Sequence, residues 1–256
     1  MNRRPSAWIP LISLLALAAA SAAAPALAQS CEARSGAQPP AVVELYTSEG
    51  CSSCPPADRW LSQLKAGGAN PVLALSFHVN YWNHLGWRDP FATPETTARQ
   101  YRLKEAMGGP YVYTPQVVLN GRDHRGWSGQ RAGDLAGLPA ATAPALRLSR
   151  QGSVVTAEVA PAPVSAGRAA AGEMAGYWAV LQDGLMSKVT RGENAGENLR
   201  HDHVVTRYQP VSVWNAARGG SHQLTLPAGT SPRVAFVVTN AALTQPVQAL
   251  VLQCPA

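Results

Sequence analysis

The sequence has little charge and no concentrated block of basic residues. Asp, Glu, Lys and Arg make up 14% of its 256 residues, and although the formal net charge is +6, no stretch interleaves Lys or Arg with aromatic residues. Such blocks are the usual footprint of nucleic-acid binding. We therefore expect no nucleic-acid partner and interpret the charge as a solvated surface.

Internal repeats and the cysteine spacings of zinc fingers are also missing, and the chain has only four cysteines. Hydrophobic residues make up 46% of the sequence, enough to bury real cores, which excludes a disordered protein. The length favours two domains of ordinary size. We expect a monomer, and the preferred function below needs no cofactor and no metal.

The N-terminal segment has the pattern of a secretory signal. Arg3 and Arg4 precede an apolar run, and Ala26–Ala28 fits an A-x-A cleavage site. We predict that residues 1–28 are a signal peptide and that the mature chain begins at Gln29, in the periplasm or outside the cell. An uncleaved membrane anchor is the alternative, because the apolar stretch approaches the length that spans a bilayer.

The most informative stretch runs from Val42 to Leu64. It contains a β-strand pattern, a turn, a Cys-x-x-Cys pair (Cys51 and Cys54) and a helical pattern. Cys51 therefore lies where a strand passes into the N-terminus of a helix, whose unpaired N–H groups and partial positive charge favour a thiolate. Because the prolines at 55 and 56 bring no N–H group, we expect only a modest lowering of the Cys51 pKa.

Four cysteines in an exported chain predict disulfides, with three possible pairings. Cys31 and Cys254 lie at the two ends of the mature chain, whereas Cys51 and Cys54 are close neighbours, so the economical pairing is 31 with 254 and 51 with 54. Closing the long loop would stabilise the fold by roughly 5 kcal/mol on the chain-entropy model. The alternative is that Cys31 is a flexible resolving thiol for Cys51.

The two halves of the chain differ in pattern. A second apolar run, Val72 to Phe77, follows the first helical pattern and predicts a parallel strand–helix–strand crossover. From Ala145 onward, short apolar runs alternate with turns, as is typical of an all-β sandwich. We predict an α/β domain over residues 41–143 followed by an all-β sandwich-like domain over residues 144–254.

Two motifs carry a resemblance. The run Leu-Tyr-Thr-x-x-Gly-Cys-x-x-Cys that ends at Cys54, with Thr114-Pro115 before a later strand, resembles the thioredoxin superfamily, which implies a thioredoxin-like fold for the α/β domain. More closely, residues 43–58, 78–91 and 114–121 look like the secreted thioredoxin-like family catalogued as domain of unknown function 1223.

The resemblance implies roles for five residues. Cys51 would be the attacking thiol and Cys54 the resolving thiol. Pro115 would be a cis-proline facing the pair, and Thr114 would offer its backbone to an extended substrate. Glu44 resembles the buried acid that shuttles a proton to the resolving cysteine.

The function we expect is thiol-disulfide exchange on exported proteins that carry thiols or disulfides, together with an unidentified redox partner. One alternative is a copper-binding protein that uses Cys51, Cys54 and His78, since two thiolates and an imidazole suit Cu(I). Another is a non-catalytic thioredoxin-like binding module in which the bridge is structural.

Other aromatic and histidine residues have simpler interpretations. We expect Trp82 and Trp87 to pack a loop onto the first domain, with contact to a peptide as the alternative. His201 and His203 share a strand face in this pattern, but two ligands do not make a metal site. We interpret both histidines as surface residues.

Overall fold

The computed structural model describes residues 30–36, 38–64, 71–140, 143–163 and 172–255. The predicted signal peptide, residues 1–28, lies outside these ranges. Within them, no helix has both the length and the apolar character needed to cross a membrane.

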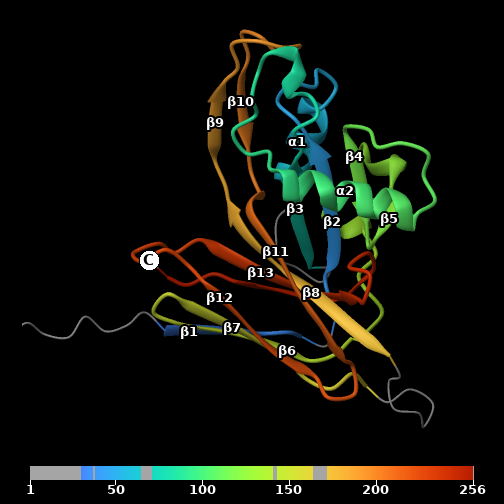
Figure 1. Cartoon of the computed structure of the whole chain (residues 1–256), viewed down its shortest axis with the longest axis vertical. Helices are drawn as coiled ribbons and strands as arrows, with labels where there is room; N and C mark the ends of the chain where they lie inside the picture. The colour runs from blue at the N-terminus through green and yellow to red at the C-terminus, as the bar shows by residue number, and fades with distance from the viewer. Residues whose placement is uncertain (1–29, 37, 65–70, 141–142, 164–171, 256) are drawn as a thin grey trace, which may run out of the picture.

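One large mixed sheet runs through the molecule (Figure 1). In spatial order its strands are β14 (Pro246–Leu252), β13 (Arg233–Asn240), β8 (Glu173–Gln182), β11 (Val204–Asn215), β3 (Val72–His78), β2 (Ala41–Thr47), β4 (Gln116–Leu119) and β5 (Arg122–Asp123). Strand β3 is parallel to β2 and to the start of β11, and the other neighbours in the sheet are antiparallel.

A second sheet packs against the β8–β13–β14 part of the first. It is antiparallel, with the strands β1 (Ser30–Arg34), β6 (Leu146–Gln151), β7 (Val154–Val159) and β12 (Gly220–Thr225). Leu148 and Val155 from this sheet share one buried cluster with Trp178 and Phe236 from the large sheet. The Cys31–Cys254 disulfide joins β1 to the segment that follows β14.

Two α-helices cover opposite faces of the large sheet. Helix α1 (Pro55–Gln63) packs on the face that carries Val43 and Leu45. Helix α2 (Pro94–Ala106) contributes Leu103 to the other face, which carries Val42 and Tyr46. This division follows from the two-residue alternation of side chains along β2. Short 3₁₀ helices in the described part of the chain include Asn83–Leu85, Arg125–Trp127 and Ala132–Asp134.

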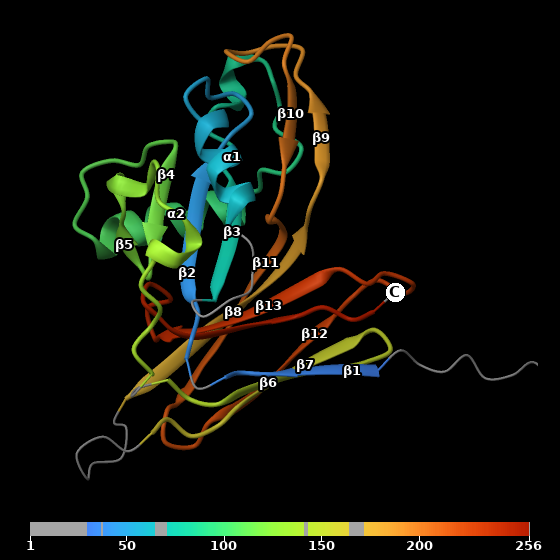
Figure 2. The same cartoon turned by 180° about the vertical axis from the view of Figure 1, so that it is seen from behind.

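A separate hairpin extends from the connection between β8 and β11. Its strands, β9 (Leu185–Lys188) and β10 (Asn198–His201), pair with each other in a two-stranded sheet. In both views the hairpin runs beside α1, toward the end of the molecule where β2 and β3 finish (Figures 1 and 2).

The predicted fold class, a thioredoxin-like α/β domain followed by an all-β sandwich-like domain, is wrong. The parallel β2–α1–β3 unit is present, but its sheet continues through β11 into β8, β13 and β14, and the chain is mostly β. The physical reason lies in β8 and β13, which are buried along nearly their whole length. Such continuous burial is expected of central strands covered on both faces, whereas sandwich strands alternate between buried and exposed residues.

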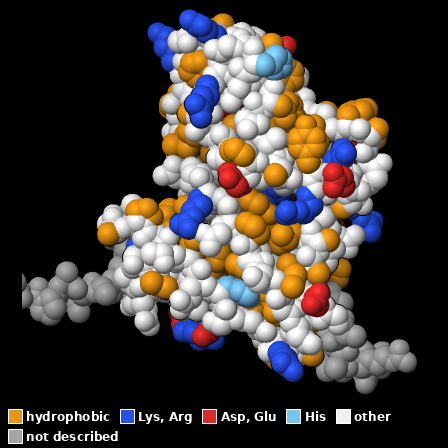
Figure 3. Space-filling view, in the orientation of Figure 1, with side chains coloured by type: hydrophobic (Ala, Val, Ile, Leu, Met, Phe, Trp, Pro, Cys, Tyr) orange, Lys and Arg blue, Asp and Glu red, His pale blue; other side chains and the backbone are white. Residues whose placement is uncertain are grey.

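On the face shown in Figure 3, Lys and Arg side chains lie singly or in small groups. Neutral, hydrophobic and acidic side chains separate them, so the described part of this face has no continuous basic surface.

Candidate active site at the Cys51–Cys54 disulfide

The Cys51–Cys54 disulfide lies where β2 passes into α1. The Cα atoms are 5.5 Å apart, and the turn is held by the Cys51 amide, which donates to the Ser48 carbonyl at 3.1 Å. Cys54 is the N-cap residue of α1 and already has helical backbone angles. Both cysteines are 0% exposed. The sequence therefore places the pair at a helix N-terminus as expected, but the tertiary structure buries it.

Trp82 connects this turn to the predicted cis-proline segment. A Cβ at Gly50 would lie 2.9 Å from the Trp82 Cβ, so Trp82 approaches the turn at a position where a larger residue would clash. The Trp82 Nε1–H donates to Thr114 Oγ1 at 2.8 Å. The Thr114–Pro115 bond is cis, which confirms that prediction. Because the next residue in the chain pairs with Tyr46 near the end of β2, Pro115 lies at the same end of the sheet as the disulfide.

Asp58 follows Cys54 by one helical turn. Its amide donates to the Cys54 carbonyl at 3.1 Å, and side chains four residues apart lie on the same side of a helix. The Asp58 side chain is buried, and its Oδ2 accepts a hydrogen bond from Thr47 Oγ1 at 3.2 Å. Its other oxygen, Oδ1, has no hydrogen-bond partner among the described residues. A buried acid therefore lies one helical turn from Cys54.

Two carboxylate–imidazole pairs complete a buried polar cluster. His78 Nδ1 lies 2.7 Å from Asp89 Oδ2, and His201 Nε2 lies 3.1 Å from Glu49 Oε1. The two imidazole rings meet edge to face with centroids 4.7 Å apart. Within the described part of the chain, His78 Nε2 and His201 Nδ1 have no partner. Together with Asp58 this makes three buried polar atoms without a partner among the described residues, in one cluster that we call the acid–imidazole cluster (Glu49, Asp58, His78, Asp89 and His201).

Burial and charge shift the pKa values in this cluster. Burial raises the pKa of Asp58 above its usual range, although the nearby imidazoles His78 and His201 partly offset the shift. Burial alone would lower the pKa of His78, but the negative charge of Asp89 and its hydrogen bond outweigh burial, and the pKa is raised. The same pair lowers the pKa of Asp89 despite its burial. Asp58 thus holds its proton more tightly than an exposed aspartate does.

The tip of the β9–β10 hairpin reaches over the Cys-x-x-Cys turn. Glu193 Oε2 accepts hydrogen bonds from the Ser52 amide at 2.9 Å and from Ser52 Oγ at 2.8 Å. The buried Asn194 side chain donates to the carbonyls of Glu49 and Cys51 at 2.9 and 3.0 Å. Residues about 140 positions further along the chain therefore form part of this site.

Glu44 lies away from the cysteines, on the α2 side of the sheet. Its carboxylate pairs with Arg99 through Nε at 2.9 Å and Nη2 at 2.5 Å, and it accepts from the hydroxyls of Tyr46 and Tyr177. Since α1 covers the opposite face, the structure does not bring Glu44 together with the disulfide. The buried acid nearest Cys54 along the helix is Asp58.

Of the other predicted residues, the structure agrees with the interpretation of some and contradicts that of one. Cys31 is bonded to Cys254, as in the economical pairing, so it does not act as a resolving partner of Cys51 in this structure. Trp87 Nε1–H donates to Glu49 Oε2 at 2.7 Å, which anchors its loop as expected. The interpretation of His201 as a surface residue is wrong, because β10 carries it into the cluster with 2% of its surface exposed.

Sequence reasoning missed Asp58, Glu49, Asp89, His201 and the hairpin tip. A signal for Asp58 was available, since it interrupts the apolar face of α1. The remaining residues come from loops and a distant hairpin whose positions are set only by folding.

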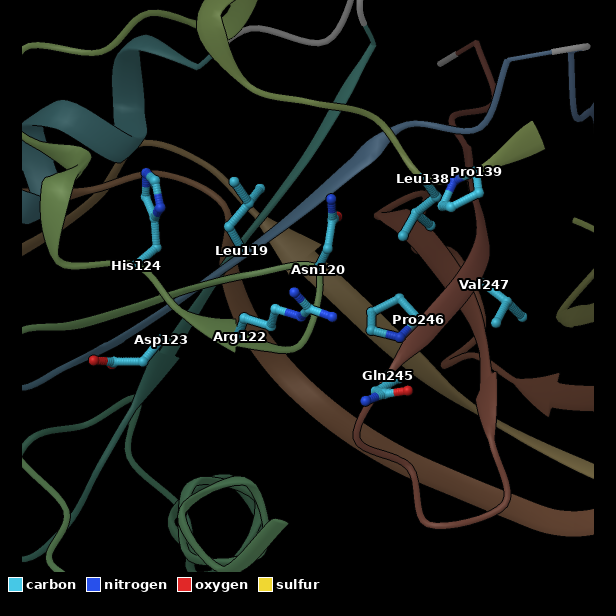
Figure 4. A pocket seen from close by; sticks show the side chains of 10 residues that line it. All are labelled: Leu119, Asn120, Arg122, Asp123, His124, Leu138, Pro139, Gln245, Pro246 and Val247. Carbon is cyan, nitrogen blue, oxygen red and sulfur yellow. The ribbon is translucent and has the colours of Figure 1, made fainter. Parts of the chain in front are cut away.

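A pocket of about 570 Å³ opens elsewhere, between the β4–β5 turn and the β13–β14 turn (Figure 4). Its labelled lining residues include Asn120, Arg122 and Pro246 but none of the cluster. In the described part of the chain, no group of three or more His, Cys, Asp or Glu side chains is arranged to hold a metal ion.

These features define a class of protein: two packed sheets with a buried disulfide at a strand-to-helix turn, backed by an acid–imidazole cluster. The chain belongs to the family described as "Protein of unknown function (DUF1223)", whose model matches residues 42–239. No curated protein matches the chain.

Two solved structures are similar to this one. The crystal structure of protein AGR_C_4864 from Agrobacterium tumefaciens has 29% sequence identity and a TM-score of 0.60, over 83% of this chain and 93% of that one. HBP35 of Porphyromonas gingivalis has 16% identity and a TM-score of 0.52, over 85% of this chain and 76% of that one. The second likeness shows the fold alone.

Proposed function

We propose that this protein is an exported thiol-disulfide oxidoreductase that acts through Cys51 and Cys54 in the periplasm or outside the cell. The observation that supports this most is the buried Asp58 one helical turn behind Cys54, with one oxygen unpartnered. An unpartnered buried polar group costs about 1–3 kcal/mol. A bridge that only braced the first helix would gain nothing from such a group, whereas a thiol exchange site needs a nearby proton acceptor.

The proposed exchange starts with a substrate thiolate that attacks Cys51 Sγ. The Cys51–Cys54 bond breaks, and its electron pair leaves on Cys54 Sγ, which takes the proton of the Asp58 carboxyl. A second substrate thiolate then attacks the substrate sulfur of the mixed disulfide, which forms the substrate disulfide and releases Cys51 as a thiolate. In the opposite direction, Asp58 accepts the Cys54 proton and Cys54 attacks Cys51 to release a reduced substrate.

The substrates in this proposal are exported proteins with thiols or disulfides, and a second protein restores the starting redox state of the pair. The copper-binding alternative with Cys51, Cys54 and His78 has no specific observation in its favour, since no group of three or more His, Cys, Asp or Glu side chains among the described residues is arranged to hold a metal ion. The non-catalytic binding module is the outcome that the following test separates from exchange.

The test uses the mature chain, equilibrated with glutathione buffers and analysed by peptide mapping. We expect the 51–54 pair to have a potential well above the value of about −300 mV or lower that is typical of structural bridges. With a peptide that carries a single disulfide, Cys54→Ser should accumulate a covalent adduct on Cys51, because the resolving thiol is gone. Cys51→Ser is the matched control and should form no persistent adduct. A potential near or below −300 mV together with no adduct would reject the exchange function and favour the non-catalytic binding module.

A further inference from the structure

Neither sulfur of the 51–54 pair reaches solvent. Cys51 and Cys54 are both 0% exposed, whereas Ser52 and Ser53 between them are exposed. Thiol exchange requires in-line approach of a sulfur to the disulfide. Some part of the surrounding protein must therefore move before any substrate reacts.

The tip of the β9–β10 hairpin supplies a cover for the pair. Gly192, with a left-handed φ of +77°, lies against the turn: a Cβ built there would be in ordinary contact with the Gly50 Cα at 3.9 Å and the Trp87 Cβ at 3.6 Å. Glu193 and Asn194 then add four hydrogen bonds to residues 49–52. These contacts hold the tip on the turn that contains Cys51.

The hairpin is tied to the rest of the molecule at its base and through His201 on β10, which is buried against Glu49. β9 and β10 form a sheet of their own, outside the eight-stranded sheet. Left-handed residues stand at both ends of the hairpin, Gly184 (φ +68°) and His203 (φ +58°). The base is clamped by hydrogen bonds from the His203 amide to Asp183 and from the Gly184 amide to Asp202. The base is thus fixed, and the tip beyond it is held on the turn by its four hydrogen bonds to residues 49–52.

Glu193 occupies the donors that a substrate would meet first. Its carboxylate oxygen accepts from both the amide and the hydroxyl of Ser52, next to Cys51. A carbonyl or carboxylate oxygen of a substrate chain is also an acceptor and can replace it. We infer that Gly192–Asn194 is an autoinhibitory cover of the Cys51–Cys54 disulfide and that a substrate must displace Glu193 from Ser52 to reach Cys51. The effect on exchange rests on the proposed function, whereas the cover itself does not.

The test measures access to the disulfide without any enzymatic activity. The oxidised protein is treated with the phosphine reductant TCEP, samples are quenched with acid and alkylated, and reduction of each disulfide is followed by mass spectrometry. Glu193→Ala and Asn194→Ala should each speed reduction of the 51–54 bridge by about two- to tenfold, the range that one net hydrogen bond supports. The double variant should exceed either single variant.

Two controls separate lifting of the tip from general loosening. Glu197→Ala removes the same charge from an exposed position in the same loop and should leave the rate unchanged. Reduction of Cys31–Cys254, whose Cys31 is partly exposed, serves in the same samples as a reference disulfide away from the hairpin tip and should also stay constant. Equal 51–54 rates in the wild type, Glu193→Ala and the double variant would overturn the cover. A fast double variant without glutathione exchange would keep the cover and reject the proposed function.

Discussion

Removing the charge of Glu44 should destabilise the protein strongly and leave exchange chemistry intact. The carboxylate and the Arg99 guanidinium are 1% and 0% exposed, and they share two hydrogen bonds. In Glu44→Gln the guanidinium remains buried without its counter-charge, a situation that costs about 3–5 kcal/mol. For a chain of this size such a loss corresponds to a fall in Tm of about 6–20 °C.

The measurement is urea and thermal denaturation of the mature oxidised protein, followed by tryptophan fluorescence. Glu32→Gln is the matched control, since Glu32 also pairs with an arginine, Arg147, but on the exposed surface, and we expect no measurable change there. The companion variant Glu44→Gln/Arg99→Met removes both charges and should recover part of the stability. An unchanged Tm in Glu44→Gln, or lost exchange in a fully folded Glu44→Gln protein, would refute the assignment of Glu44 to the fold and return it to the proton shuttle.

Three further predictions follow from the site and the long-range bridge. Asp58→Asn keeps the shape of the side chain but not its proton transfer, so stopped-flow exchange should slow by about 100-fold or more with no loss of Tm; an unchanged rate would remove Asp58 from the mechanism. The pKa of His78 is raised above its ordinary value of 6.5, so its contribution to stability is complete below pH 6.5 and is lost as the pH rises through the folded-state value. A series of Tm measurements from pH 5 to 9 should therefore fall more steeply for the wild type than for His78→Gln, and parallel curves would contradict this. Cys31→Ser/Cys254→Ser should lower the unfolding free energy in urea by about 2–5 kcal/mol while mapping still finds the 51–54 bridge, and scrambled pairing would count against independent roles for the two disulfides.

Local sequence patterns were sufficient for the part of the site that is local in the chain. The β2–turn–α1 segment was predicted from its apolar run, glycine turn and prolines, and the structure shows the same order of elements. The cis bond at Pro115 and the pairing of all four cysteines also followed from motifs and positions in the sequence. These features depend on short-range geometry or on the few pairings that four cysteines allow.

The choice of the buried acid required the fold. Glu44 and Asp58 are both acids within 10 residues of a cysteine, but side chains alternate along β2, so Glu44 faces α2 while Thr47 and Asp58 lie on the α1 side. The alternation along a strand and the periodicity of a helix each show which residues share a face. They do not show which helix covers which face of the sheet, so they cannot decide which acid lies beside the cysteines.

The sequence by itself determined the strand–helix turn with its Cys-x-x-Cys pair, the cis-proline and the membership of the chain in its family. Only the tertiary structure decided that the sheet continues from β3 through β11 into β8, β13 and β14, that His201 joins His78 behind the disulfide, and that Glu193 and Asn194 cover it. The physical reason is that short-range patterns record the burial of a residue but not its partner. The contacts between residue 52 and residue 193 exist only after the intervening 140 residues have folded.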